Sequence, residues 1–191
     1  MTTDWQPLEH ELQAWQQQGL TLPLWWRDDD AIDPTPQLDQ LTSLSQALGL
    51  PVHLAIIPRD ATASLAEYVL SSSQLIPVVH GWAHHNHAPQ GDKKSEYGPR
   101  RPIAETLTEA GRSLDTLQGL FGDALTPMFV PPWNRISDHL IPGLAGLGYS
   151  SLSTFKPRTH TEAAPGLMQI NTHLDPINWS GNRSLVPPQD L

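Results

Sequence analysis

The sequence predicts an α/β fold with a parallel sheet, and three observations support this prediction. Short apolar runs alternate with amphipathic segments along the chain, which is the pattern of strands joined by crossover helices. Polar clusters directly follow several of these runs, at the strand ends where such folds hold functional residues. The length of 191 residues suits one ordinary domain, so we expect residues 1–191 to form a single domain.

The expected elements are placed by hydrophobic spacing and turn residues. An N-terminal helix follows Asp4, with apolar residues three or four apart, and Gly19 ends it. Six strands are expected at residues 22–26, 52–57, 75–79, 125–133, 149–155 and 167–174. Helices are expected at residues 36–48, 61–70, from Pro102 onward and at 137–147, where Pro142 weakens the first half. Residues 184–191 read as a loop and the first turn of a helix, so we expect a last helix and strand to be missing from this chain.

Composition narrows the classes of function. The formal net charge of -9 disfavours nucleic acid and anionic membrane surfaces as partners. The chain has no cysteine, so any metal must be held by imidazole and carboxylate groups. No apolar run is long enough to span a membrane, and the first residues lack the features of an export signal. We therefore expect a cytoplasmic protein with no membrane partner.

Histidines and aspartates lie at the ends of two expected strands. His80 and His84, spaced four residues apart, follow the apolar run 75–79, and Asp28, Asp29 and Asp30 follow the first strand. Two imidazoles and one carboxylate form a ligand set that suits Zn²⁺ or another borderline divalent ion and leaves positions open for water and substrate. The alternative is structural: a solvated turn of aspartates and a surface loop of histidines with incidental metal affinity.

Three segments carry a resemblance to a known family: residues 27–31 (RDDDA), 80–84 (HGWAH) and 129–134 (FVPPWN). They resemble the first three motifs of the polysaccharide deacetylase superfamily, carbohydrate esterase family four. Those motifs are usually written Thr-Phe-Asp-Asp-Gly, His-Ser-x-x-His and Arg-x-Pro-Tyr. The resemblance implies an irregular (β/α)7 barrel, here expected to lack its last strand and helix, in which residues 1–191 form a deacetylase-like catalytic domain.

The resemblance also implies roles for individual residues. Asp29 corresponds to the general base, although a register one residue earlier would make Asp28 the base and Asp29 the ligand. Metal ligands and substrate-binding residues follow from the matching positions: the metal ligands are Asp30, His80 and His84, and the substrate is contacted by Pro132, Trp133 and Asn134.

Two departures from the motifs leave alternatives open. Val130 occupies the position of the motif arginine that orients the base, so Arg27 or Arg135 would have to supply this charge. The general acid is either His173 or a histidine on a C-terminal strand that this chain lacks. His173 followed by Asp175 is alternatively a structural pair at a strand end.

The function that the resemblance implies is metal-dependent hydrolysis of N-acetyl groups from an amino sugar or glycan, by attack of a metal-bound water. The expected cofactor is a divalent metal, with zinc the leading candidate, and the expected partner is a small-molecule or oligosaccharide substrate. Two alternatives remain: a catalytically impaired barrel that binds a glycan, and a hydrolase of a small non-sugar amide. The basic loop residues Lys93, Lys94, Arg100 and Arg101 either contact an anionic substrate group or are simply solvated.

Overall fold

The computed structural model describes residues 4–179, 181–187 and 190. The chain divides into two compact units, one formed by Trp25–Thr172 and the other by Met1–Leu24 together with His173–Leu191. Each unit is described separately. That residues 1–191 act as one catalytic domain stays a prediction.

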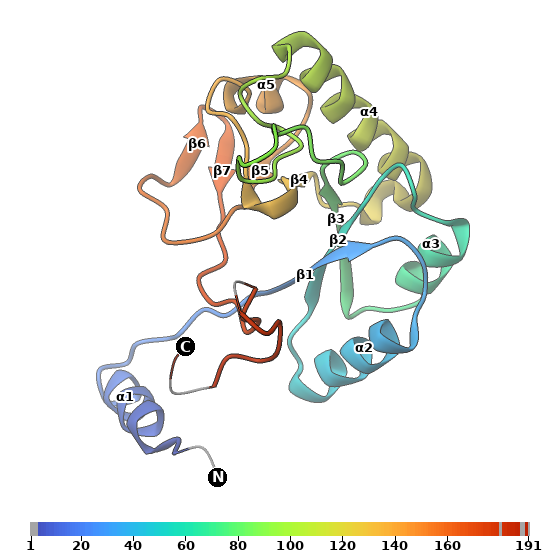
Figure 1. Cartoon of the computed structure of the whole chain (residues 1–191). Coiled ribbons are helices and arrows are strands. Elements are labelled where there is room, and N and C mark those ends of the chain that lie inside the picture. The colour runs from blue at the N-terminus through green and yellow to red at the C-terminus, as the bar shows by residue number, and fades with distance from the viewer. Residues whose placement is uncertain (1–3, 180, 188–189, 191) are drawn as a thin grey trace. The chain divides into compact units, whose positions relative to one another are not determined.

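A seven-stranded sheet forms the larger unit, with the strand order β1-β2-β3-β4-β5-β7-β6 (Figure 1). Neighbouring strands pair in parallel from β1 through β5 to β7, and only β6 runs antiparallel to its neighbour. The bounds are β1 Trp26–Ala31, β2 Val52–Ile56, β3 Leu75–His80, β4 Met128–Val130, β5 Ser151–Leu152, β6 Glu162–Ala164 and β7 Leu167–Gln169. All six expected strands are thus present, and their parallel pairing confirms the predicted fold class.

Helices cover one face of this sheet. They are α2 Pro36–Leu48, α3 Ala63–Leu70, α4 Ile103–Phe121 and α5 Ile141–Gly146, with short 3-10 turns at Gly122–Ala124 and Pro132–Asn134. Thr35 and Thr62 cap α2 and α3 by accepting a hydrogen bond from the backbone three residues on. The main hydrophobic core joins these helices to alternate residues of the strands, among them Leu54, Val79 and Phe129.

The opposite face of the sheet is its inner face. A smaller apolar cluster of Ala55, Val78, Met128 and Val130 lies there, with Trp25 and Ile170 packed against it. Because side chains alternate along a strand, Arg27 and His80 belong to this face as well. The inner face therefore carries both polar and apolar side chains.

The sheet curls strongly around its inner face. In a flat sheet, four strand spacings would separate β1 from β5 by about 19 Å, which is more than an arginine and a serine side chain can span. Yet Arg27 Nη1 on β1 lies 2.8 Å from Ser153 Oγ, directly after β5. Trp25 Nε1 likewise donates to the carbonyl of Asn171, after β7, at 3.2 Å. The sheet has the curvature of a barrel, but within the described residues no backbone pairing joins β1 to β6 or β7, so the barrel is open.

Several expected boundaries differ from the structure. The first strand was expected at residues 22–26, but β1 begins at Trp26 and runs through the three aspartates. Pro23 removes one backbone donor, and the paired strand starts beyond it. The strand β6 was missed because its three residues have no apolar run of their own. In the region expected as a helix from residue 137, α5 begins only at Ile141, next to Pro142.

The smaller unit contains α1, Gln6–Gln17, as predicted from its apolar spacing. Its C-terminal part includes an antiparallel bridge between Ile177 and Leu185. The helical turn expected at the end of the chain includes positions outside the described residues. None of the helices in the described part of the chain has the length and apolarity that a membrane span requires.

Candidate metal centre

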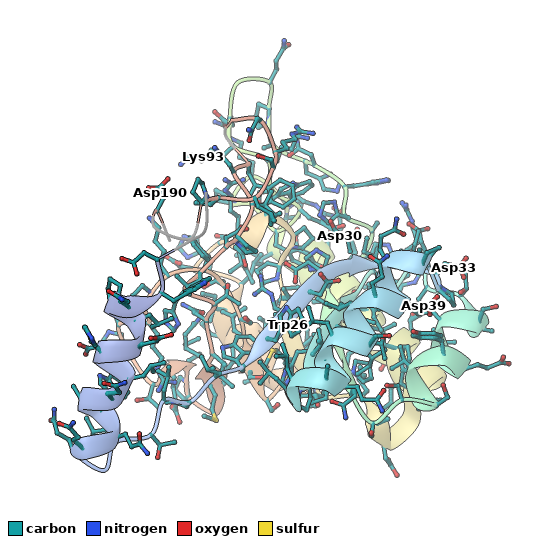
Figure 2. The ribbon with its side chains drawn as sticks, turned by 90° about the horizontal axis from the view of Figure 1, so that it is seen from below. Trp26, Asp30, Asp33, Asp39, Lys93 and Asp190 are labelled. Atoms are coloured by element: carbon teal, nitrogen blue, oxygen red, sulfur yellow. The ribbon has the colours of Figure 1, made fainter. Side chains whose placement is uncertain are left out.

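A kink in β1 allows consecutive aspartates to serve different purposes. In a regular strand Asp29 and Asp30 would point to opposite faces of the sheet. The pairing of β1 with β2 shifts register between Asp28 and Ala31, and Asp30 has a φ of 76°, in the left-handed region. Aspartate tolerates this conformation better than most residues. Figure 2 shows Asp30 farther along β1 than Trp26, toward the carboxyl end of the strand.

Asp30, His80 and His84 form a three-residue cluster at this end of the sheet. The Asp30 Oδ1 atom lies 2.9 Å from His80 Nε2 and 3.2 Å from His84 Nε2. One ligand atom from each residue lies within 4.8 Å of the others. The structure therefore brings together the three residues that the sequence predicts as metal ligands.

The chemistry of this cluster fits a divalent cation. His80 is almost fully buried, and its Nδ1–H donates to the carbonyl of Val130 at 3.1 Å. In the neutral ring this leaves a lone pair on Nε2, which faces a carboxylate oxygen at hydrogen-bond distance. Two acceptors this close need a proton or a cation between them. Donation of the other ring nitrogen to a carbonyl is also the usual way to orient a metal-binding histidine.

Electrostatics in the cluster favour a charged carboxylate. The hydrogen bond with His80 lowers the pKa of Asp30 from its ordinary value, against the opposing effect of burial. The side chain of Asp30 is 59% exposed, whereas that of His80 is 2% exposed. A cation at this cluster would thus be accessible from solvent through the aspartate side.

Arg27 holds Asp29 beside the cluster. Its Nε and Nη2 atoms donate to the two oxygens of Asp29 at 2.8 and 2.9 Å, a bidentate pair. The same guanidinium donates to Ser153 Oγ and to Asn134 Oδ1, each at 2.8 Å. The other candidate, Arg135, instead donates to the backbone carbonyl of Lys94. Of the two arginines that the sequence offers, Arg27 is the one that contacts Asp29.

Asp28 lies apart from these contacts. All three aspartates line a cavity of about 290 Å³ together with residues of α2, including Gln37 and Leu41. Burial, and then the charges of Asp29 and Asp30, raise the pKa of Asp28 to about 6. Asp28 is thus neither part of the cluster nor paired with Arg27, and the register in which Asp29 and Asp30 form the functional pair stays a prediction.

The turn after β4 places two of the three predicted substrate-binding residues beside the cluster. Trp133 and Asn134 both have a φ of 57°, and the Trp133 ring centroid lies 4.3 Å from that of His84. Pro132 is buried behind the turn. The side-chain oxygen of Asn134, Oδ1, accepts a hydrogen bond from Arg27. Asn134 therefore contacts the arginine that holds Asp29.

The remaining candidates do not join the cluster. His173 belongs to the smaller unit, so its role as general acid stays a prediction. The carboxylate of Asp175 accepts from the backbone of Ile177 and from the indole of Trp179.

Two of the four basic residues in the loop that follows the histidines are paired with carboxylates of the same chain. Arg100 pairs with Asp92, and Arg101 pairs with Glu105 and Glu109. Burial of Arg101 between two carboxylates makes an anionic substrate contact there unfavourable.

Sequence reasoning missed two residues that shape the centre, Ser153 and Glu96. Ser153 could have been found from strand periodicity, since it continues the inner face beyond β5. Glu96 lies in a polar loop, and no pattern in the neighbouring residues distinguishes it from a solvated glutamate.

Comparison with known proteins supports the fold. No family model and no curated protein sequence matches the chain. Among solved structures, a de-N-acetylase from Aggregatibacter actinomycetemcomitans superposes with a TM-score of 0.61 at 14% identity, over 90% of this chain and 77% of that chain. The Streptococcus pyogenes deacetylase PplD, in complex with acetate, gives 0.58 at 16% identity over 87% and 71%. IcaB from Ammonifex degensii gives 0.58 at 13% identity over 85% and 67%.

At these identities the likeness carries the fold rather than the activity. The first two of these structures are described as a de-N-acetylase and a deacetylase, and a further similar structure, from Mycobacterium smegmatis, is described as a putative polysaccharide deacetylase. The chain therefore shares its fold with these deacetylase structures, as its three motifs implied, in the form of an open barrel.

Proposed function

We propose that this protein removes N-acetyl groups from an amino sugar or glycan in a reaction that depends on a divalent ion. The observation that carries the proposal is the cluster of Asp30, His80 and His84 with Asp29 held beside it by Arg27. The fold shared with solved deacetylases supports the same reaction class. Zinc suits the donor set of two imidazoles and one carboxylate.

Asp30, His80 and His84 would hold the ion, which would supply a Lewis acid that polarises the acetyl carbonyl and acidifies water. Asp29 accepts the proton that the attacking water loses, as a general base. Arg27 fixes the Asp29 carboxylate in one orientation through its two parallel hydrogen bonds. That His173 donates the proton to the leaving amine stays a prediction.

The substrate would bind against the turn after β4. The Trp133 ring, next to His84, offers an apolar surface on which a sugar face can pack. A cavity of about 460 Å³ is lined by Asn134 and Arg135 on one side and by Arg158, His160 and Gln169 on another. This volume lies in the range of small-molecule sites, and its polar lining suits a hydroxyl-rich ligand.

The test is metal content and acetate release measured on the same preparation. Protein purified without a histidine tag should bind one Zn²⁺ per chain and release acetate from acetylated amino-sugar oligomers. His80→Ala should abolish both properties. His85→Ala is the matched control, because the His85 ring contacts Arg59 rather than the cluster. Failure of the wild-type chain to bind added Zn²⁺, or full activity in His80→Ala, would contradict the proposal.

The same assay separates the two alternatives. A catalytically impaired barrel would bind the oligomers without releasing acetate. Valine at position 130, in place of the motif arginine that orients the base, favours this impaired barrel. The contact of Arg27 with Asp29 weighs against it, because Arg27 supplies the missing charge. A hydrolase of small amides would act on a non-sugar acetamide and leave the oligomers intact. The cytoplasmic location stays a prediction.

A further inference from the structure

The loop between the two histidines of the cluster is organised around one buried carboxylate. Three backbone N–H groups of this loop donate to Glu96: Trp82 to Oε2 at 3.1 Å, and Ala83 and His85 to Oε1 at 2.8 and 3.3 Å. The residue is 1% exposed. Its carboxylate therefore takes the place of water for three donors that the turn leaves without backbone partners.

The Glu96 carboxylate is held by backbone N–H groups rather than by a positively charged side chain. Among the ion pairs of the described residues, none involves its carboxylate. A carboxylate removed from water needs several strong donors to remain stable, and here these are backbone groups of a single loop. The loop and the carboxylate thus depend on each other.

Gly81 makes this close approach possible. Its φ is 56°, and a Cβ atom at this position would lie 2.3 Å from Glu96 Oε2 and 2.6 Å from Pro132 Cδ. Any side chain here would displace the carboxylate or the turn after β4. The glycine, where the related motif has serine, is required by the packing of Glu96 against the loop.

His84 is the residue that this arrangement controls. Its φ is 54°, a left-handed conformation that a histidine adopts at a cost. The bonded N–H groups of Ala83 and His85 lie on either side of it, so Glu96 holds both neighbours of the strained residue. His80 needs no such support, since it ends β3 and is bonded to Val130.

We infer that Glu96 is a positioning residue for the metal centre, which holds His84 in the conformation that lets it bind the ion together with Asp30 and His80. The inference rests on the proposed metal site, and it predicts a specific effect on metal affinity. Second-sphere contacts of this kind typically change metal affinity by about 10- to 100-fold.

The experiment measures Zn²⁺ affinity by calorimetry and the visible spectrum of bound Co²⁺ in the full chain. Glu96→Gln should weaken Zn²⁺ binding by at least about 10-fold and alter the Co²⁺ spectrum, because an amide cannot accept from all three donors with the same charge. Glu96→Asp keeps the charge and should bind with intermediate affinity. Glu67→Gln makes the same chemical change at an exposed helix position and should bind as the wild type does.

A further variant separates positioning from loss of stability. Tyr149→Phe removes a buried hydrogen bond to the carbonyl of Ala110, remote in sequence from the cluster, and should lower stability without changing Zn²⁺ affinity. Unchanged affinity in Glu96→Gln would overturn the inference while the wild type still binds metal. If that variant does not fold, unchanged affinity in Glu96→Asp overturns it. Absence of binding in the wild type would instead overturn both this inference and the metal site beneath it.

Discussion

Replacing Arg27 by lysine tests how the proposed base is held. The guanidinium donates two hydrogen bonds to Asp29 and one each to Ser153 and Asn134, and its side chain is 4% exposed. A lysine ammonium keeps the positive charge but cannot present a planar fork of donors. The substitution therefore leaves the charge balance unchanged and removes the geometry.

The size of the effect follows from the bonds lost. Lysine can retain one charged bond to Asp29, so the variant loses one further charged bond and two bonds to neutral acceptors. At about 1.5 kcal/mol for the first and about 1 kcal/mol for each of the others, the loss comes to about 3.5 kcal/mol. Asp29 is 31% exposed, so water replaces part of this, and we expect a destabilisation of about 2 kcal/mol. We expect kcat to fall about 100-fold, because the base is no longer fixed.

The assay combines urea unfolding with rates of acetate release. Arg59→Lys is the matched control, because Arg59 makes the same kind of bidentate pair with an aspartate, Asp60, at an exposed position. It should change stability by less than about 0.5 kcal/mol and leave kcat near the wild-type value. Wild-type stability and rate in Arg27→Lys would refute the reasoning, and so would equal losses in the two variants.

Four further predictions concern charge and packing around the site. Asp30→Asn should abolish Zn²⁺ binding in a direct titration, whereas Asp28→Asn should retain it; the reverse result would establish the earlier register. Because the folded-state pKa of Asp28 is raised to about 6, metal-free wild-type protein should lose stability as the pH rises from about 4 to 6, and Asp28→Asn should lack this decline in chemical unfolding. Glu109→Gln should lower the free energy of unfolding by about 1–2 kcal/mol at pH 7. The hydrogen bond with Arg101 lowers the pKa of Glu109, so the stability difference between wild type and variant should vanish as the pH falls through that lowered pKa. A stability difference that is independent of pH would contradict this. Gly81→Ala should reduce both thermal stability and Zn²⁺ affinity, because its Cβ would overlap a buried carboxylate and a proline ring.

The sequence was sufficient for the parallel sheet and for the three clustered ligands. Parallel strands end at the same edge of a sheet, so an aspartate run after one apolar segment and two histidines after another must approach each other. That argument needs only the order of the elements, and errors of a few residues in their boundaries do not disturb it. The structure does bring Asp30, His80 and His84 together, and their role as metal ligands stays a prediction.

Interactions that depend on loop conformation could not be predicted in this way. Glu96 reaches the histidine loop from a segment without regular secondary structure, and nothing in its neighbouring residues signals a buried carboxylate. The left-handed conformations of His84 and Trp133 are equally invisible, since residues other than glycine rarely adopt them. These features arise from tertiary packing, which a pattern of single residues does not encode.

The contact between Arg27 and Asp29, by contrast, was within reach of the sequence. Residues two apart in a strand lie on the same face, so an arginine at position 27 and an aspartate at position 29 become neighbours once the strand is known to include both. The expected strand, residues 22–26, includes neither Arg27 nor Asp29. It therefore does not place them on one face, and the sequence offers both Arg27 and Arg135 as the arginine that orients the base. The observed strand, Trp26–Ala31, includes both Arg27 and Asp29. Position 130 is a valine, so the positive charge that holds the proposed base, Asp29, comes from Arg27 on the same strand. Ser153 and Asn134 accept hydrogen bonds from the Arg27 guanidinium and fix its position from across the curled sheet.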